Sequence, residues 1–253
     1  MTARPVALIT GGARRVGRAT ALELARAGLD LIVTAHRSIG EGESLIREAA
    51  SLGAATTLIQ LDLADSDAVS AAASRLATTL PRLDVLVHNA STYEPSPLDR
   101  ISAERIARDY RTNALAPLLL SAHLAPLLSR SALPGGGAIV AMCDIHALGE
   151  HGLPRPGFAS YAMSKAALAE MVRSLARDLA PSVRVNAVAP GVVAWPEHAP
   201  ESDAAMQKAY LSRVPLARAG TPDDAARAVR WLALDATYIT GEIIRLDGGR
   251  SLR

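Results

Sequence analysis

The sequence predicts an α/β fold in which one doubly wound parallel sheet of seven strands carries helices on both faces. Short apolar runs alternate along the chain with longer stretches whose apolar residues have helical spacing. The short runs are apolar throughout, as strands buried on both faces of a parallel sheet are. No linker interrupts this alternation in the 253 residues, so a single domain spanning residues 1–253 is expected.

The strands are expected where Val, Ile and Leu cluster, at residues 6–10, 31–35, 57–61, 85–87, 138–142, 183–188 and 243–246. Between them, helical spacing predicts helices at residues 16–27, 41–52, 66–80, 102–113, 116–128, 158–179 and 221–233. Gly28 stops the first helix, and Thr221, with Pro222 at the first helical position, begins the last. Pro126 is expected to end or kink its helix. Residues 192–214 are poorly periodic and are predicted to be a substrate-loop insertion with a short helix near 202–212.

The composition argues against several classes of protein. The formal net charge is only +2 and the arginines are scattered, so no nucleic-acid partner is expected. Cys143 is the single cysteine, which excludes an internal disulfide and a cysteine-based metal site, and no metal is expected. The first apolar run is too short for a signal peptide and none reaches membrane-spanning length, so a cytoplasmic protein without a membrane partner is expected.

A glycine-rich turn follows the first expected strand directly and leads into a helix. This order is typical of a dinucleotide-binding (Rossmann) unit, because glycines let the backbone approach a pyrophosphate and the helix N-terminus offers unpaired N–H groups. The residues of this turn expected to bind the cofactor are Gly11, Arg14, Arg15, Val16 and Gly17.

The end of the second strand indicates which dinucleotide is bound. An NAD-binding unit has an acid near this point for the ribose 2′-hydroxyl, whereas this chain has His36, Arg37 and Ser38. The guanidinium fork of Arg matches phosphate oxygens. These residues therefore predict a 2′-phosphate pocket and NADPH or NADP as the cofactor, with an ordinary basic loop as the alternative.

A candidate catalytic pair lies on the helix predicted at 158–179. Tyr161 and Lys165 are four residues apart and share one helix face. A nearby ammonium favours the phenolate, so we expect Lys165 to lower the Tyr161 pKa from its usual value of about 10. Such a tyrosine can deliver a proton to an atom that is receiving a hydride. Asp144 ends the fifth strand, where open α/β sheets place their sites.

Several motifs, taken in order, resemble the short-chain dehydrogenase/reductase family. They are Thr10-Gly11 with Gly17, Asn89-Ala90, Asn113, Tyr161-x3-Lys165, Pro190-Gly191 and Asp247-Gly248-Gly249, and together they cover nearly the whole chain. The resemblance implies that Lys165 binds the ribose hydroxyls and that Asp62 meets the adenine. It also implies that Asn113 holds a helix bend and a water leading to Lys165.

Three departures from the usual family pattern are similar to pteridine reductases and bacterial dihydromonapterin reductases. Arg15 stands at the usual middle glycine of the turn, Asp144 at the usual catalytic serine, and Ser91 at the usual glycine after Asn-Ala. The stretch Trp195-Pro196-Glu197-His198 is more similar to the dihydromonapterin reductases. The resemblance implies NADPH-dependent reduction of dihydropterins, with dihydrofolate or oxidised pterins as further substrates. A pterin brings N–H donors, which suit the acceptor Asp144 better than a simple ketone does.

Together these interpretations assign the candidate site. The catalytic residues are Asp144, Tyr161, Lys165 and Asn113. The cofactor-binding residues are Gly11, Arg14, Arg15, Val16, Gly17, His36, Arg37, Ser38, Asp62, Leu63, Asn89, Ala90, Ser91, Tyr161, Lys165, Pro190, Gly191 and Val192. The substrate-binding residues are Arg15, Ser91, Tyr93, Asp144, Tyr161 and Trp195, with Tyr93 stacking on the pterin. A surface tyrosine is the alternative interpretation of Tyr93, and the Val192–Trp195 stretch lacks the threonine that contacts the carboxamide in many relatives.

Two other functions remain open from the sequence. One is a carbonyl or 3-oxoacyl-thioester reductase of the same fold, which Asp144 disfavours. The other is an NADP-binding regulator without turnover, which the presence of Tyr161 and Lys165 disfavours. The resemblance also implies a homotetramer, in which the C-terminal tail, including Arg253, reaches a neighbouring subunit's site.

Overall fold

The computed structural model describes residues 4–148, 152–195 and 203–252. Its seven strands form one sheet in the order β3-β2-β1-β4-β5-β6-β7, and each neighbouring pair is parallel. The strands are β1 (Val6–Ile9), β2 (Asp30–Ala35), β3 (Thr56–Gln60), β4 (Val85–His88), β5 (Gly137–Met142), β6 (Val183–Pro190) and β7 (Ile243–Leu246). The predicted doubly wound parallel sheet is thus confirmed, with strand bounds within a few residues of those expected.

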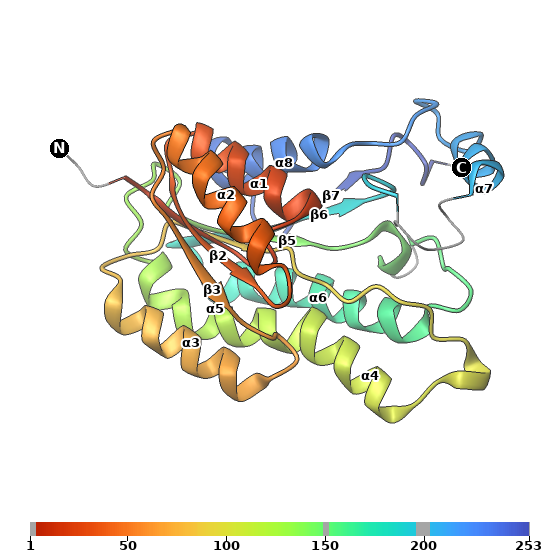
Figure 1. The fold of residues 1–253 in the computed structure, drawn as a ribbon, viewed down its shortest axis with the longest axis horizontal. Helices are drawn as coiled ribbons and strands as arrows, with labels where there is room; N and C mark the ends of the chain where they lie inside the picture. Colours follow the sequence, from red (N-terminus) through yellow and green to blue (C-terminus); the bar gives the residue numbers. More distant parts are fainter. Residues whose placement is uncertain (1–3, 149–151, 196–202, 253) are drawn as a thin grey trace.

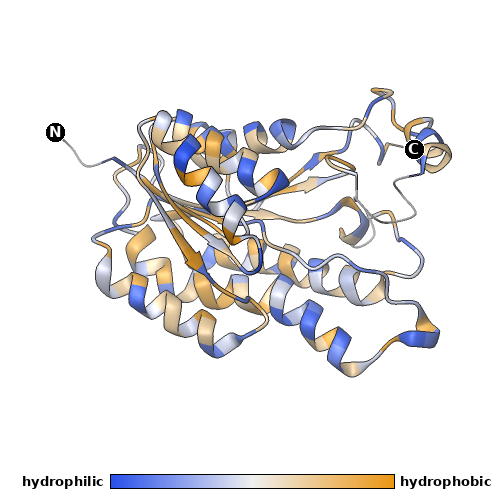
Figure 2. Cartoon of the chain, viewed as in Figure 1, coloured by the Kyte–Doolittle hydropathy of each residue, from blue (hydrophilic) through white to orange (hydrophobic). Residues whose placement is uncertain are grey.

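Helices cover both faces of the sheet (Figure 1). They are α1 (Arg15–Arg26), α2 (Ile39–Ser51), α3 (Ser66–Thr79), α4 (Ala103–Tyr110), α5 (Ala116–Leu128), α6 (Ala159–Asp178), α7 (Ala204–Leu211) and α8 (Pro222–Arg230). Helices α1, α2 and α8 pack on one face and α3, α5 and α6 on the other, so two separate apolar cores flank the sheet. Figure 2 shows the strands as mainly apolar ribbons between these layers.

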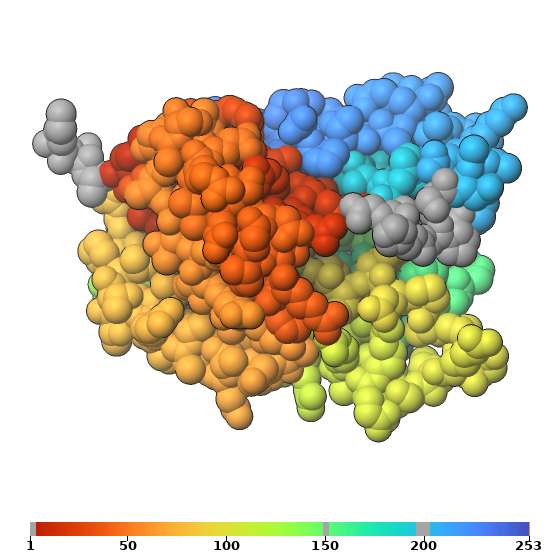
Figure 3. Space-filling view, in the orientation of Figure 1, coloured from red at the N-terminus to blue at the C-terminus, as the bar shows by residue number. Residues whose placement is uncertain are grey.

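The two ends of the sequence meet on one side of the sheet. Helix α8 packs against α1 although some two hundred residues separate them in the chain. Figure 3 shows the corresponding contact, where the red and orange N-terminal segments adjoin the blue C-terminal ones. The segment that follows β6 lies beside the glycine-rich turn that follows β1, where Arg15 donates to the carbonyls of Ala194 and Trp195.

Helices α4 and α5 differ from the two separate helices expected. A π-helical turn, η2 (Arg111–Leu115), joins them into one continuous element, and the Ala116 N–H donates to the Arg111 carbonyl, five residues back. Extra residues of this kind inside helices are frequent at functional sites, and Asn113 lies within this turn. Pro126 does not end α5, which continues to Leu128, so it lies in the last turn.

Within the described residues, no helix is long and apolar enough to cross a membrane. The short helix expected near 202–212 is α7, and the Asp203 side chain caps it by accepting from Ala205 N and Met206 N. Ser202, the expected start of that helix, lies outside the described residues. The same is true of Pro196, Glu197 and His198 and of Arg253.

Candidate active site

A cavity of about 1300 Å³ opens at the carboxyl ends of β1, β2, β4, β5 and β6. The predicted site residues that line it are Gly11, Arg14, Arg15, Val16, Gly17, His36, Asp62, Leu63, Asn89, Ala90, Ser91, Tyr93, Asp144, Tyr161, Pro190, Gly191, Val192 and Trp195. Arg37, Ser38, Asn113 and Lys165 are not among the lining residues. Ligand sites of open α/β sheets lie at this edge.

The glycine-rich turn leaves no room for side chains where it passes Asn89. A Cβ on Gly17 would lie 2.2 Å from the Gly11 carbonyl oxygen and 2.5 Å from Asn89 Nδ2. The Asn89 amide donates to the carbonyls of Thr10 (3.0 Å) and Gly11 (3.1 Å). Asn89 therefore holds the shape of the turn, a structural role in addition to lining the cavity.

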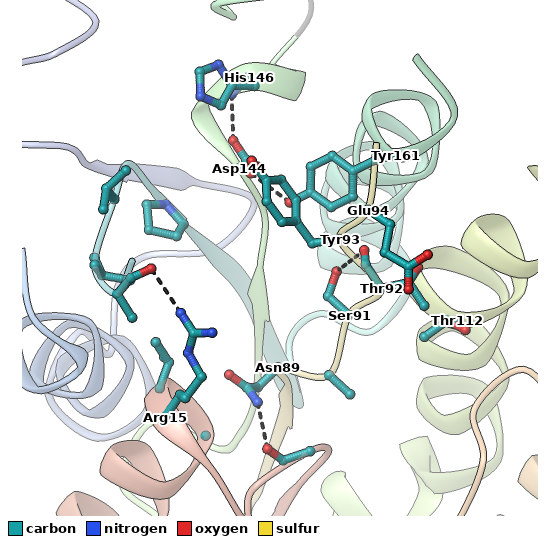
Figure 4. A pocket seen from close by; sticks show the side chains of 18 of the residues that line it. Arg15, Asn89, Ser91, Thr92, Tyr93, Glu94, Thr112, Asp144, His146 and Tyr161 are labelled. Atoms are coloured by element: carbon teal, nitrogen blue, oxygen red, sulfur yellow. Dashed lines mark hydrogen bonds between the residues drawn. The ribbon is translucent and has the colours of Figure 1, made fainter. Parts of the chain in front are cut away.

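Arg15 occupies the turn with a left-handed backbone, at a φ of 50°. Its guanidinium Nη2 donates to the carbonyls of Ala194 (3.0 Å) and Trp195 (2.9 Å), across the cavity from α1 (Figure 4). A left-handed conformation costs an L-residue about 1–2 kcal/mol. The sequence suggested that Arg15 contacts ligand oxygens; the structure adds a tie between the turn and the segment after β6.

The residues after β2 are exposed. His36 faces the cavity, and its Nε2 lies 3.7 Å from the Asp62 carboxylate at the end of β3. Arg37 lies beside it with an exposed side chain. Helix α1 begins nearby with no acidic residue in its first turn. The N–H groups of that turn, the cramped Gly17 and the nearby Arg37 guanidinium fit a dinucleotide phosphate at the start of α1.

Asp144, Tyr161 and Lys165 come together at the end of β5 and the start of α6. The Tyr161 hydroxyl donates to Asp144 Oδ2 at 2.6 Å, and the His146 N–H donates to Asp144 Oδ1 at 2.8 Å. Lys165 Nζ donates to the Met142 carbonyl at 2.7 Å and lies 5.9 Å from the centre of the Tyr161 ring. The helical spacing predicted this pair correctly, and the carboxylate accepts a hydrogen bond from the phenol as expected.

The expected direction of the Tyr161 pKa is wrong for this arrangement. Burial, followed by the charge of Asp144 and the hydrogen bond to it, raises the pKa of Tyr161 well above its usual range. Burial also lowers the pKa of Lys165. The helical spacing brought the ammonium close to the ring, but it did not reveal that a carboxylate would be bonded to the phenol itself. Tyr161 therefore holds its proton tightly.

A buried network that the sequence did not reveal supports this pair. Asp109, which is fully buried, accepts from Ser160 Oγ (2.6 Å), Thr92 Oγ1 (2.8 Å) and Arg105 Nε (3.0 Å). One turn later Asn113 donates to Ser164 Oγ at 2.9 Å. Asp109 and Asn113 are four residues apart, and so are their partners Ser160 and Ser164. These hydrogen bonds therefore hold one face of α4 and η2 against the face of α6 beside Tyr161 and Lys165.

Asn113 also fixes the loop that follows β4. Its Oδ1 accepts from the Thr92 N–H (2.9 Å) and from Ser91 Oγ (3.1 Å). Asn113 therefore links the loop after β4 to Ser164 of α6, and its implied role in holding a helix bend and a water leading to Lys165 stays a prediction. The signal that could have identified the network was the serine pair at 160 and 164, which has the same spacing as Tyr161 and Lys165.

Aromatic rings line the cavity next to Tyr161. Tyr93 packs edge-on against Tyr161, with ring centres 4.9 Å apart, and stacks on Phe158 at 4.9 Å. The Arg155 guanidinium lies 4.2 Å from the Phe158 ring centre and bonds the Tyr93 hydroxyl. Figure 4 shows Tyr93, Tyr161 and Asp144 gathered on one side of the pocket. Tyr93 thus lines the cavity while remaining partly exposed.

The opposite wall comes from the C-terminal part of the chain. Trp195 meets Tyr210 of α7 edge-on, with ring centres 5.5 Å apart, and the Tyr210 hydroxyl accepts from the Val192 N–H at 3.1 Å. The Arg250 guanidinium lies 5.7 Å from the Tyr210 ring centre. Trp195 was predicted from the sequence, whereas Tyr210 and Arg250 were not, because no local spacing connects them to the strand ends.

Within the described residues, no cluster of three or more His, Cys, Asp and Glu side chains is arranged to hold a metal ion. The single cysteine, Cys143, is buried, and burial raises the pKa of its thiol to about 12. The carboxylate of Asp144, the phenol of Tyr161 and the ammonium of Lys165 can form hydrogen bonds and transfer protons.

Comparison with known proteins assigns the family. A family profile described as "Enoyl-(Acyl carrier protein) reductase" matches residues 11–251. An uncharacterised oxidoreductase of Escherichia coli, YgfF, is 30% identical over 249 residues, covering 97% of this chain and 99% of the relative. The 3-oxoacyl-[acyl-carrier-protein] reductase FabG of Staphylococcus aureus is 34% identical over 245 residues, covering 96% of each chain.

Solved structures agree with these relatives. A putative short-chain alcohol dehydrogenase from Sinorhizobium meliloti superposes with a TM-score of 0.87 at 28% identity, covering 97% of this chain and 96% of that one. Acetoin dehydrogenase YohF of Salmonella typhimurium gives 0.85 at 29% identity, covering 99% and 97%. With the fold and the Asp144–Tyr161–Lys165 arrangement described above, these matches show that this chain is an oxidoreductase of the short-chain dehydrogenase/reductase family.

Proposed function

We propose that this protein uses NADPH to reduce a dihydropterin to a tetrahydropterin. The observation that carries the proposal is the carboxylate of Asp144, which lines the cavity and accepts a hydrogen bond from the Tyr161 hydroxyl at 2.6 Å. An ionised carboxylate accepts hydrogen bonds but does not donate them. It therefore suits a substrate with N–H groups, such as the amino-pyrimidine edge of a pterin, and offers nothing to a bare carbonyl oxygen.

The strongly held proton of Tyr161 also favours a pterin over a carbonyl substrate. The raised Tyr161 pKa makes this phenol a weak acid. A dihydropterin is reduced at a C=N bond, whose nitrogen is more basic than a carbonyl oxygen and accepts a proton from a weaker acid. NADPH supplies the hydride when bound, while Tyr161 holds the proton and Asp144 orients the phenol and the substrate.

The aromatic wall supports a flat substrate. Tyr93 and Tyr161 meet edge-on beside Asp144, and Phe158 with Arg155 fixes the Tyr93 ring. Flat rings pack selectively against such walls. We propose Tyr93 and Trp195 as the aromatic residues nearest the pterin, with Ser91 and Arg15 close to its polar edge.

The preference for NADPH is part of the proposal. His36 and Arg37 follow β2, and no acid stands there for a ribose 2′-hydroxyl. We propose that Arg37 and Ser38 bind the 2′-phosphate, that Asp62 and Leu63 meet the adenine, and that Lys165 holds the ribose hydroxyls. Among the described residues, the Lys165 ammonium donates a hydrogen bond only to Met142, so donors remain for this task.

A carbonyl or 3-oxoacyl-thioester reductase is the second candidate, because named relatives carry such activities in their names. FabG of S. aureus and acetoin dehydrogenase of S. typhimurium favour it over pterin reduction. The site residues favour the pterin, since a carboxylate occupies the position of the usual serine. An NADP-binding regulator without turnover is disfavoured, because Asp144, Tyr161 and Lys165 are assembled. We further propose a cytoplasmic homotetramer, which light scattering on the purified protein tests.

One experiment separates the two reductase candidates. NADPH oxidation is followed with dihydrobiopterin, dihydromonapterin and dihydrofolate beside a panel of ketones and a 3-oxoacyl thioester. Turnover confined to pterins supports the proposal, and turnover confined to carbonyls replaces it with the second candidate. The Asp144→Ser variant is the matched test, since it restores the hydroxyl: we expect it to lose pterin turnover and to gain measurable ketone turnover.

A further inference from the structure

Arg250 has an unused hydrogen-bond donor in the wall of the catalytic cavity. Its side chain lines the cavity, and among the described residues its guanidinium makes no hydrogen bond or ion pair, with Nε itself shielded from water. Within the described residues, its guanidinium contacts only the face of the Tyr210 ring, at 5.7 Å. A charged donor group without an acceptor is unfavourable, so a ligand that supplies an acceptor at this wall gains affinity.

The nearest acid in the sequence does not satisfy this arginine. The two carboxylate oxygens of Asp247 accept from the backbone, Oδ1 from the Gly249 N–H at 2.9 Å and Oδ2 from the Ser251 N–H at 2.8 Å. The Arg250 N–H donates to the Asp247 carbonyl at 3.1 Å. Asp247 thus shapes the turn after β7 and presents Arg250 to the cavity without neutralising it.

The packing around Tyr210 holds this cation in the wall of the cavity that contains the reacting groups. A Cβ on Gly191 would lie 2.9 Å from the Tyr210 hydroxyl, so glycine is what lets α7 approach the end of β6. Tyr210 and Asp144 both line this cavity. Arg250 therefore lies at the far wall of the cavity that contains Asp144 and Tyr161.

The charges at this end of the cavity are predominantly positive. Arg155, Arg213 and Arg250 line it. The acids that line it there are Asp144, which is bonded to Tyr161, and Glu94, which forms an ion pair with Arg105. Arg155 lies on aromatic rings and Arg213 Nε donates to the Ala209 carbonyl. Of these three arginines, Arg250 is the one whose guanidinium makes no hydrogen bond to the described residues.

We infer that Arg250 binds an anionic group, a carboxylate or a phosphate, on the side chain of the pterin substrate. This inference rests on the proposed function and refines it: the preferred substrates are dihydropterins whose side chain carries a negative charge. A guanidinium binds such oxygens through paired N–H bonds. Arg250 is then a specificity residue, distinct from the groups that hold and transfer the proton.

The test compares ligands that differ only in this charge. Tryptophan fluorescence quenching measures the affinity of the purified protein for neopterin and neopterin 3′-phosphate, and for folic acid and its dimethyl ester. We expect the charged member of at least one pair to bind about tenfold or more tightly, as charge-assisted hydrogen bonds allow. The phosphate pair and the carboxylate pair together identify which anion is recognised.

Variants assign the preference to Arg250. We expect Arg250→Gln to abolish it while changing the affinity for neutral neopterin less than threefold, and Arg250→Lys to keep part of it. Arg177→Gln, which removes an exposed arginine of α6 away from the cavity, is the matched control for lost charge and should keep it fully. Equal affinities within both wild-type pairs, or a preference unchanged in Arg250→Gln, overturn the inference even if dihydropterins are reduced. If neither neopterin nor folic acid binds, the proposed function itself fails.

Discussion

The Arg15 guanidinium donates to the Trp195 carbonyl at 2.9 Å and so joins the glycine-rich turn after β1 to the segment after β6. The two residues are 180 positions apart in the chain. Arg15 makes this contact from a backbone at φ 50°, where glycine is the unstrained residue. A strained non-glycine residue that bridges two walls of a ligand cavity indicates a functional use of that strain.

Two substitutions at this position separate the strain from the contact. Arg15→Ala and Arg15→Gly both lose the bonds to Ala194 and Trp195, but only Gly relieves the left-handed backbone. We expect the free energy of unfolding of Arg15→Gly, measured with urea, to be about 1 kcal/mol higher than that of Arg15→Ala. Both variants should raise the KM for the dihydropterin by a similar factor. A KM that stays at the wild-type value in both would show that the tie does not position the substrate loop.

Much of the fold followed from local sequence signals, and the exceptions have a physical cause. Strand runs, the glycine-rich turn and the Tyr161–Lys165 spacing all depend on neighbours within a few residues, and all were predicted. The continuous passage from α4 to α5 was missed because a π turn has no propensity signature of its own. Asp109, Tyr210 and Arg250 were missed because their partners come from distant segments brought together only by tertiary packing.

The electrostatics of the reacting groups also could not be predicted from the sequence. The spacing showed that Lys165 lies near Tyr161, but burial and the direct hydrogen bond to Asp144 dominate the Tyr161 pKa. Desolvation depends on the whole shell of packed atoms around a group. A spacing of four residues therefore predicts proximity without predicting the direction of the pKa shift.

Removing the charge of Asp144 should lower the Tyr161 pKa. In Asp144→Asn the negative charge beside the phenol disappears, so the phenolate becomes less unfavourable and we expect its titration to move to lower pH. Ultraviolet difference titration measures it, with Tyr161→Phe identifying which signal belongs to this residue. Dihydropterin turnover should fall at least about a hundredfold in either variant, the lower end for lost acid–base catalysis. An Asp144→Asn titration unchanged from wild type would contradict the coupling.

Burial of His88 should make the protein sensitive to acid. His88 lies under the site with Nε2 2.8 Å from Ser121 Oγ, and burial lowers its pKa from 6.5 to about 3. Between these values the unfolded chain takes up a proton that the folded chain refuses. The free energy of unfolding is therefore unaffected above about pH 6.5 and falls below it, by up to about 1.4 kcal/mol per pH unit.

His88→Gln provides the control for this acid sensitivity. Urea unfolding measures how far the free energy of unfolding falls from pH 7.5 to pH 5. We expect this fall to be smaller in His88→Gln than in wild type by about 2 kcal/mol, because the titrating group is gone. A decline of the same size in both proteins would assign the acid sensitivity to other groups. The comparison is internal to each protein, so any stability lost by the substitution itself at neutral pH does not enter it.

Asp109 should position Tyr161 without taking part in the reaction. Asp109→Asn leaves the partly buried Arg105 with a weaker partner and replaces an acceptor of Ser160 by an amide, so we expect a loss of about 3 kcal/mol in the free energy of unfolding. Ser160→Ala removes one hydrogen bond and should cost about 1 kcal/mol. Both should lower kcat more than they raise KM, with the Tyr161 titration unchanged. A shifted titration would mean that Asp109 acts on the phenol directly.

Arg37 tests the assignment of the cofactor. Its side chain is exposed at the end of β2, beside His36, so its removal should leave the fold and the free energy of unfolding nearly unchanged. If the guanidinium binds the 2′-phosphate, Arg37→Ala should lower the affinity for NADPH by about ten- to a hundredfold, the usual contribution of hydrogen bonds to a charged group. Because NADH lacks this phosphate, we expect the affinity for NADH to fall less than threefold. Arg47→Ala, an equally exposed change within α2, controls for general loss of positive charge, and an equal weakening of both cofactors by Arg37→Ala would exclude the 2′-phosphate pocket.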